Sequence, residues 1–199
     1  MSTTYIPQLS IPLEDSSIAL RPMLAEDFDA LFAVASDPLI WEQHPDRYRY
    51  TREVFEKFFT GALQSAGAYC VFDTQSGAMI GSSRYYNLYP EEYEKYCAQV
   101  QLGSTISIGY TFLARTHWGG TYNHSMKRLM INNALQTFDT VVFQVGEQNI
   151  RSQTAVQRIG AQRIPVTDDL QNDGGGIDTH VVFVMNKALW KVSPISHSN

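Results

Sequence analysis

Apolar residues along this chain follow two spacings. In four stretches they recur every three or four positions, which predicts amphipathic helices, and in seven others they alternate or run together, which predicts strands. The predicted helices cover residues 26–35, 51–62, 121–138 and 148–159. The predicted strands cover residues 17–21, 69–73, 78–85, 105–114, 140–145, 162–166 and 179–185.

Turn and capping residues support these boundaries. Asp37-Pro38 ends the first helix, Thr51 is a good N-cap for the second, and Thr74–Gly77 has the composition of a hairpin turn. Strand 105–114, helix 121–138 and strand 140–145 form a crossover unit, which pairs its two strands in parallel. The order of elements predicts one α/β (α+β) domain with a mixed central sheet flanked by helices.

Two aromatic-rich stretches show neither spacing. Residues 41–50 contain Trp, His, Tyr and Pro and are predicted to be a loop. Residues 85–96 hold five tyrosines beside Glu91, Glu92 and Glu94. Most of these tyrosines are interpreted as an aromatic cover over the sheet, and a loop beside the substrate is the alternative.

Composition narrows the class of protein. The chain has 199 residues, of which 44% are hydrophobic and 18% charged, so it can bury the core of one domain. A net charge of −5 argues against a nucleic-acid partner. Cys70 and Cys97 lack the spacing of a metal site, and we expect no metal. We see no signal peptide or bilayer-spanning apolar stretch, so we expect a cytoplasmic protein without a membrane partner.

The segment from Ile108 to Asn123 contains the candidate chemistry. A strand leads through Gly119-Gly120 into a helix, whose first backbone N–H groups lack intrahelical partners. These groups and the positive end of the helix dipole favour an anion, and glycine lets the backbone approach it closely. An ordinary tight turn is the alternative. The segment is neither a Walker A loop nor a dinucleotide-binding fingerprint.

Four motifs in order resemble the GCN5-related N-acetyltransferase (GNAT) superfamily, and within it the branch of ribosomal-protein N-terminal acetyltransferases. The resemblance covers residues 17–187. Its motifs are Leu20-Arg21-Pro22 before Ala25-Glu26-Asp27, then Ile108-Gly109-Tyr110 with Leu113, then Trp118-Gly119-Gly120-Thr121-Tyr122-Asn123, and finally Asn149, Ser152 and Gly160.

The resemblance implies acetyl transfer from acetyl-coenzyme A to a primary amine by direct attack. It implies that two central strands splay around the pantetheine arm. Backbone contacts to that arm would come from Phe112, Leu113 and Ala114, and the pyrophosphate would bind Trp118, Gly119, Gly120, Thr121, Tyr122 and Asn123. Asn149 would hold the pantetheine or place the thioester, with a helix N-cap as the alternative role. Ser152 would protonate the leaving thiolate, with a surface hydroxyl as the alternative role.

The chain departs from the family pattern in two respects, at the loop before the helix and at the expected general base. Relatives usually have Gly at the position of Thr121, and Gly or Ala at the position of Asn123. Ser107 stands where many relatives have a Glu that acts as general base. His44, Glu91 and Glu92 lie in predicted loops that can flank the acceptor site, but the base stays open. Two further hypotheses are therefore a coenzyme A-binding or interaction domain without catalysis and a transferase for another acyl group, such as succinyl.

The expected organisation is an N-terminal arm (1–16), the acetyltransferase domain (17–190) and a C-terminal tail (191–199). The acceptor is expected to be a small-molecule amine or a polypeptide α-amine. A homodimer formed through an edge strand or the tyrosine-rich stretch is a further expectation.

Overall fold

The computed structural model describes residues 6–172 and 175–197. Its helices are α1 (Ile6–Leu9), α2 (Phe28–Ala35), α3 (Arg52–Gln64), α4 (Pro90–Cys97), α5 (Tyr122–Ala134), α6 (Ile150–Arg158) and α7 (Lys187–Lys191), with short 3₁₀ turns η1 (Ala25–Asp27), η2 (Pro38–Ile40) and η3 (Arg115–His117). Its strands are β1 (Leu13–Glu14), β2 (Ile18–Pro22), β3 (Ala68–Asp73), β4 (Met79–Tyr86), β5 (Thr105–Leu113), β6 (Thr140–Gly146), β7 (Gln162–Gln171) and β8 (Ile177–Asn186).

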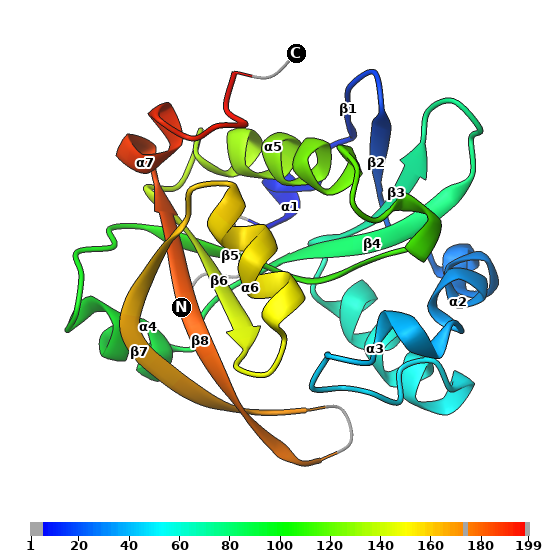
Figure 1. Ribbon diagram of the computed structural model, residues 1–199, viewed down its shortest axis with the longest axis horizontal. Coiled ribbons are helices and arrows are strands. Elements are labelled where there is room, and N and C mark those ends of the chain that lie inside the picture. Colours follow the sequence, from blue (N-terminus) through cyan, green and yellow to red (C-terminus); the bar gives the residue numbers. More distant parts are fainter. Residues whose placement is uncertain (1–5, 173–174, 198–199) are drawn as a thin grey trace.

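The strands form one mixed sheet in the order β1-β2-β3-β4-β5-β6-β8-β7 (Figure 1). Among the described strands, β5 and β6 pair in parallel and every other neighbouring pair is antiparallel. The parallel pair is joined by α5, as the crossover prediction requires. The predicted fold class, an α/β domain with a mixed central sheet, is confirmed.

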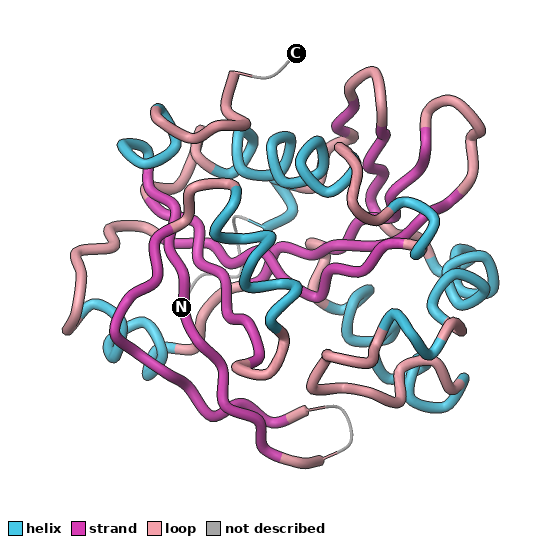
Figure 2. The backbone as a smooth tube through the Cα atoms, viewed as in Figure 1, coloured by secondary structure: helices cyan, strands magenta, loops and turns pink. Residues whose placement is uncertain are grey.

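Helices cover both faces of this sheet (Figure 2). Residues alternate between the faces along β6: Val141, Phe143 and Val145 belong to the core under α5 and α6, whereas Val142 belongs to a smaller core under α4. A third apolar cluster, rich in phenylalanine, joins α2 and α3 to β3 and β5. The end of β5 therefore lies between two packed helical layers.

Three parts of the chain differ from the sequence-based expectations. The tyrosine-rich stretch is not a loop throughout, because residues 90–97 form α4, which starts with Pro90 and two acids in its first turn. Strand β7 continues through Asp168 and Asp169, which were expected in a loop; Gly174 of that loop lies outside the described residues. Helix α7 was not expected at all.

Both predicted terminal segments contact the domain. Ile6 and Leu9 of the expected arm are buried in the main core, and β1 pairs with β2. Ile195 of the expected tail is buried in the same core. The described parts of both segments thus contribute to the packed structure, while residues 1–5 and 198–199 lie outside the described residues.

Candidate functional site

The parallel strands β5 and β6 separate after a short paired region. They pair from Thr105 to Ser107, although β5 continues to Leu113 and β6 to Gly146. Tyr110 has a φ of +52°, and the register between β4 and β5 shifts at this point. A bulge of this kind bends its strand, so β5 follows β4 and leaves β6. The predicted splay of the central strands is confirmed.

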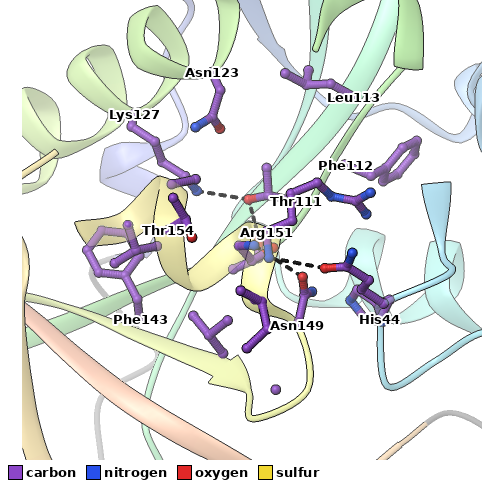
Figure 3. A pocket seen from close by; sticks show the side chains of 18 of the residues that line it. His44, Thr111, Phe112, Leu113, Asn123, Lys127, Phe143, Asn149, Arg151 and Thr154 are labelled. Atoms are coloured by element: carbon purple, nitrogen blue, oxygen red, sulfur yellow. Dashed lines mark hydrogen bonds between the residues drawn. The ribbon is translucent and has the colours of Figure 1, made fainter. Parts of the chain in front are cut away.

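A cavity of about 630 Å³ lies at this split. It is bordered by the diverging ends of β5 and β6, the start of α5 and one side of α6 (Figure 3). The end of η2 and the loop after it contribute Ile40, Trp41, Gln43, His44 and Pro45. Each wall comes from a different part of the chain, which is why only the assembled fold creates the cavity.

The turn before α5 stands at one end of the cavity. Gly119 has a φ of +73°, a conformation that side chains disfavour, and a Cβ placed there would meet no atom within 4 Å. Thr121 is the N-cap of α5 but its side chain forms no capping hydrogen bond. The first N–H groups of α5 are therefore available to an anion. Trp118 braces the turn, because its Nε1 donates to the Leu113 carbonyl at 2.9 Å.

Most of the predicted site residues border this cavity. Those that do are Phe112, Leu113, Trp118, Gly119, Gly120, Asn123, Asn149 and Ser152. Ala114, Thr121 and Tyr122 do not border it. The structure thus brings the two distant predicted segments, the turn before α5 and the start of α6, to one place.

Asn149 and Ser152 are joined by a local capping contact. The Asn149 side chain is buried, and its Oδ1 accepts the backbone N–H of Ser152 at 3.1 Å as the N-cap of α6. The Nδ2 group is not used by this contact. The Ser152 side chain is half-buried at the cavity wall.

Sequence reasoning missed Lys127. Its side chain, 6% exposed, points from α5 into the cavity, and its Nζ donates to Thr111 Oγ1 on β5 at 2.9 Å (Figure 3). Burial lowers the pKa of Lys127 to about 7. The available signal was its spacing: Lys127 follows Asn123 by one helical turn and so shares its face.

The cavity wall carries basic groups and no acids. Among the described lining residues there is no Asp or Glu, although the chain has a net charge of −5. The basic groups are Lys127, Arg151, Arg158 and four histidines, His44, His117, His124 and His180. Such a wall favours an anionic ligand.

Arg151 contacts three parts of the cavity wall. Its guanidinium lies 4.0 Å from the centre of the Trp118 ring, and Nη2 donates to the Ile40 carbonyl at 2.8 Å. Its backbone N–H donates to Gln43 at 3.1 Å. Helix α6 is thereby connected both to the turn before α5 and to the loop after η2.

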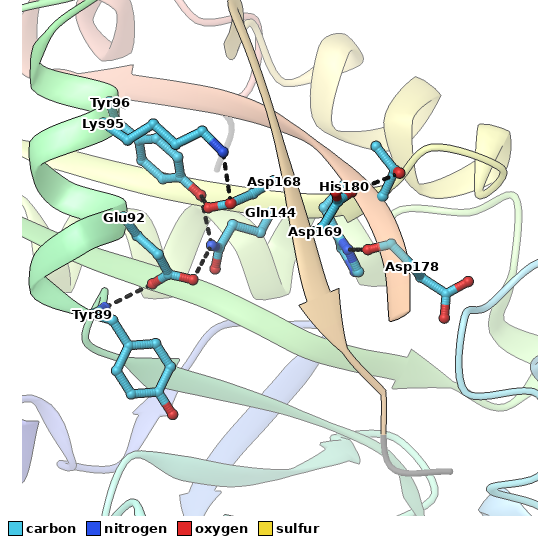
Figure 4. A network of polar contacts seen from close by, with 10 residues as sticks. Tyr89, Glu92, Lys95, Tyr96, Gln144, Asp168, Asp169, Asp178 and His180 are labelled. Atoms are coloured by element: carbon cyan, nitrogen blue, oxygen red, sulfur yellow. Dashed lines mark hydrogen bonds and ion pairs between the residues drawn. The ribbon is translucent and has the colours of Figure 1, made fainter. Parts of the chain in front are cut away.

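Two of the histidines that border the cavity, His44 and His180, differ in how their ring nitrogens are used. The Asp46 N–H donates to Nδ1 of His44 at 2.9 Å, and burial, followed by the charge of Arg49, keeps the pKa of His44 well below its usual value. The ring of His44 is therefore neutral at pH 7. His180 Nδ1 lies 2.9 Å from the Asp178 carbonyl, which can only accept, so in the neutral ring Nδ1 carries the proton and Nε2 has the lone pair (Figure 4).

Ser107 is buried and does not border the cavity. On its side of the sheet, Gln144 reaches the cavity wall and is held by a polar network (Figure 4). Its Oε1 accepts from Tyr86 (2.9 Å), and its Nε2 donates to Glu92 (2.9 Å) and Tyr96 (2.7 Å). Burial raises the pKa of Glu92.

Glu91 and Glu92 therefore do not flank the cavity from a loop as expected. Both belong to α4 and neither borders the cavity, whereas His44 does. Among the described residues we find no cluster of side chains suited to a metal ion, and no helix long and apolar enough to cross a bilayer.

Known structures share this fold. A GCN5-related N-acetyltransferase from Brucella melitensis aligns over 94% of this chain and 82% of its own, with a TM-score of 0.70 and 19% identity. A GNAT-family acetyltransferase from Bacillus anthracis aligns over 89% of this chain and 99% of its own, with a TM-score of 0.68 and 13% identity. Mycobacterium smegmatis RimJ in complex with CoA-disulfide aligns over 94% of this chain and 90% of its own, with a TM-score of 0.62 and 15% identity. No curated protein sequence matches the chain.

The splayed parallel pair and the helix that begins beside it define an acetyltransferase fold. The model of the acetyltransferase (GNAT) domain matches residues 17–162. The chain belongs to the GNAT acetyltransferase family. The expected family is confirmed, and RimJ, from the branch named by the sequence motifs, is among the structural neighbours.

Proposed function

We propose that this protein transfers an acetyl group from acetyl-coenzyme A to a primary amine by direct attack. The observation that supports this most is the cavity between β5 and β6, which begins at the first N–H groups of α5 and has no acid among its described lining residues. Coenzyme A carries phosphates at one end and a thiol-bearing arm at the other. The turn at Gly119-Gly120 suits the pyrophosphate, and the split suits the arm.

In this proposal the cofactor-binding residues predicted from the sequence keep their roles. The backbone of Phe112, Leu113 and Ala114 would follow the pantetheine arm, although Ala114 lies outside the cavity wall. Trp118, Gly119, Gly120 and Asn123 would meet the pyrophosphate with Thr121 and Tyr122 of the first turn. Asn149 Nδ2 would orient the thioester end, and Ser152 would lie beside it.

The amine must lose a proton, and His180 is the proposed acceptor of that proton. Its Nδ1–H is engaged by the Asp178 carbonyl, so Nε2 can receive a proton. The cavity wall offers no carboxylate for this role among the described residues. Ser107, at the position of the family's Glu, is buried away from the cavity.

Gly120→Phe tests the cofactor site. A Cβ at Gly120 would come only within 3.8 Å of Tyr122, an ordinary contact, so the variant should fold. The added ring would occupy the anion site, and we expect calorimetry to show coenzyme A affinity at least tenfold lower. Thr60→Phe, on the exposed side of α3, is the control and should bind normally. Unchanged affinity in Gly120→Phe would refute the placement of the pyrophosphate.

An acetyl-coenzyme A consumption assay with a panel of amines, followed by mass analysis of the product, tests the reaction. Transfer to one class of amine would identify the acceptor as a small molecule or a polypeptide α-amine. Tight binding without transfer to any amine would instead favour a coenzyme A-binding domain without catalysis. The same panel with succinyl-coenzyme A tests transfer of another acyl group, which the basic cavity wall favours as the second candidate.

A further inference from the structure

Lys127 is a buried amine that lacks a counter-charge. Its Nζ donates to Thr111 Oγ1 and lies 5.6 Å from the centre of the Phe143 ring. Thr111 Oγ1 in turn lies 2.8 Å from Ser83 Oγ. Within residues 6–172 and 175–197, no carboxylate lies within ion-pair distance of Nζ. Burying an unpaired amine destabilises the folded state. A ligand in the cavity would give this amine a partner.

The position of Lys127 follows from the order of the site along β5. This step rests on the proposed function. The pyrophosphate turn (118–123) stands at the mouth, the arm would pass Ala114, Leu113 and Phe112, and Thr111 comes next toward the interior. Lys127 lies one turn, about 5.4 Å, along α5 from Asn123, and its Nζ ends at Thr111. The amine is therefore where the arm's sulfur would arrive.

We propose that Lys127 is the general acid that protonates the coenzyme A thiolate as it leaves. The lone pair of the acceptor amine forms a bond to the thioester carbonyl carbon, and the carbon–sulfur bond breaks with its electrons on sulfur. The Lys127 ammonium gives one proton to that sulfur and becomes a neutral amine. The new amide nitrogen loses one proton to His180, which passes it to water, and water returns one proton to Lys127.

The chemistry of the side chain fits this step. With a pKa near 7, the ammonium is a stronger acid than a thiol, whose usual pKa is about 8.5, so it can give a thiolate its proton. The Ser152 hydroxyl is far less acidic. Burial alone lowers the pKa of Lys127. The other ionisable groups that line the same cavity are Tyr110 and six basic residues, His44, His117, His124, Arg151, Arg158 and His180.

Kinetics of acetyl transfer to hydroxylamine test the proposal, because this small nucleophile replaces the unidentified acceptor. In Lys127→Met we expect kcat to fall about 10²-fold, with the KM for acetyl-coenzyme A within about twofold of wild type. Above pH 7 the wild-type kcat should fall as Lys127 loses its proton. Lys127→Met should lack this fall of kcat above pH 7, which is the basic limb of the pH profile.

Lys127→Arg separates proton transfer from charge. A guanidinium keeps the positive charge but does not release its proton at accessible pH. We therefore expect Lys127→Arg to be as slow as Lys127→Met and to lack the basic limb. Wild-type kcat in Lys127→Arg would show that charge alone matters and would overturn the proposal. An acetyl group found on Lys127 by mass analysis would also overturn it, because the amine would then be a nucleophile.

The outcomes distinguish this proposal from the proposed function. Calorimetry with coenzyme A is run on every variant, and comparable affinity shows that the cavity is intact. If wild type fails to bind coenzyme A, the proposed function fails and this proposal fails with it. If binding and transfer are present but Lys127→Met matches wild type in kcat and pH profile, only the role of Lys127 is refuted.

Discussion

At the residue scale, the tautomer of a single histidine decides which group can act as base. His180 and His44 both border the cavity, but His44 uses Nδ1 to accept the Asp46 N–H and is buried against Arg49. His180 donates from Nδ1 to a backbone carbonyl and keeps Nε2 as a proton acceptor. A shared pocket therefore contains one histidine suited to proton abstraction and one that is held neutral by its neighbours.

His180→Gln tests this assignment. Glutamine is polar and of similar reach but accepts no proton at neutral pH, so we expect kcat to fall about 10²-fold while coenzyme A affinity stays within about twofold. The measurement is steady-state acetyl transfer with calorimetry beside it. His197→Gln, at an exposed position near the C-terminus, is the control and should behave as wild type. Normal turnover in His180→Gln would return the search for the base to the other histidines.

At the element scale, the sequence predicted the elements that build the cavity better than the side chains that fill it. Strand β5, helix α5 and strand β6 follow directly from apolar spacing and the glycines near Trp118. Helix α4 was missed because its tyrosines obscured the helical start signal at Pro90, Glu91 and Glu92. Lys127 was missed because a lysine followed by Arg128 on an amphipathic helix looks like a surface residue until the opposite wall is known.

Helix α6 offers a test that separates capping from function at Asn149. Asn149→Ser keeps a side-chain oxygen that can cap the helix but removes the amide donor, whereas Asn149→Ala removes both. We expect Asn149→Ala to lose about 1 kcal/mol of stability, Asn149→Ser to lose little, and both to lose turnover or coenzyme A affinity. Unfolding in denaturant and steady-state kinetics measure the two effects.

Asn186→Ala is the matched control for that experiment. Asn186 caps α7 through the Leu189 N–H at 2.9 Å and does not border the cavity. It should lose stability and keep full turnover and affinity. If Asn149→Ser likewise kept full turnover and affinity, Asn149 would be a structural cap without a role in the reaction.

At the scale of the whole molecule, the cavity links ligand binding to stability. Strands β5 and β6, helices α5 and α6 and the segment after η2 meet around a space whose described lining residues include several basic side chains and no acids. Among them, the buried amine of Lys127 lacks a counter-charge, which disfavours the folded state. An anionic ligand would offset this cost, because a ligand that binds only the folded state stabilises it. The cost itself depends on pH through Lys127.

The sign of that pH dependence follows from linkage. The folded-state pKa of Lys127 is lowered to about 7, from 10.5 in the unfolded chain, so between these values the unfolded state binds one more proton than the folded state. The contribution of Lys127 to stability therefore rises with pH from about 7 to about 10.5, and below pH 7 its penalty stays constant. Lys127→Met removes the penalty, so its stability advantage over wild type should be greatest below pH 7. From pH 7 to pH 9 this advantage should shrink by about 2 kcal/mol, because the slope reaches about 1.4 kcal/mol per pH unit only above the folded-state pKa. Denaturant unfolding of both proteins without ligand at pH 6, 7 and 9 measures the difference, and parallel pH dependence in the two would show that Lys127 is ionised normally in the folded state.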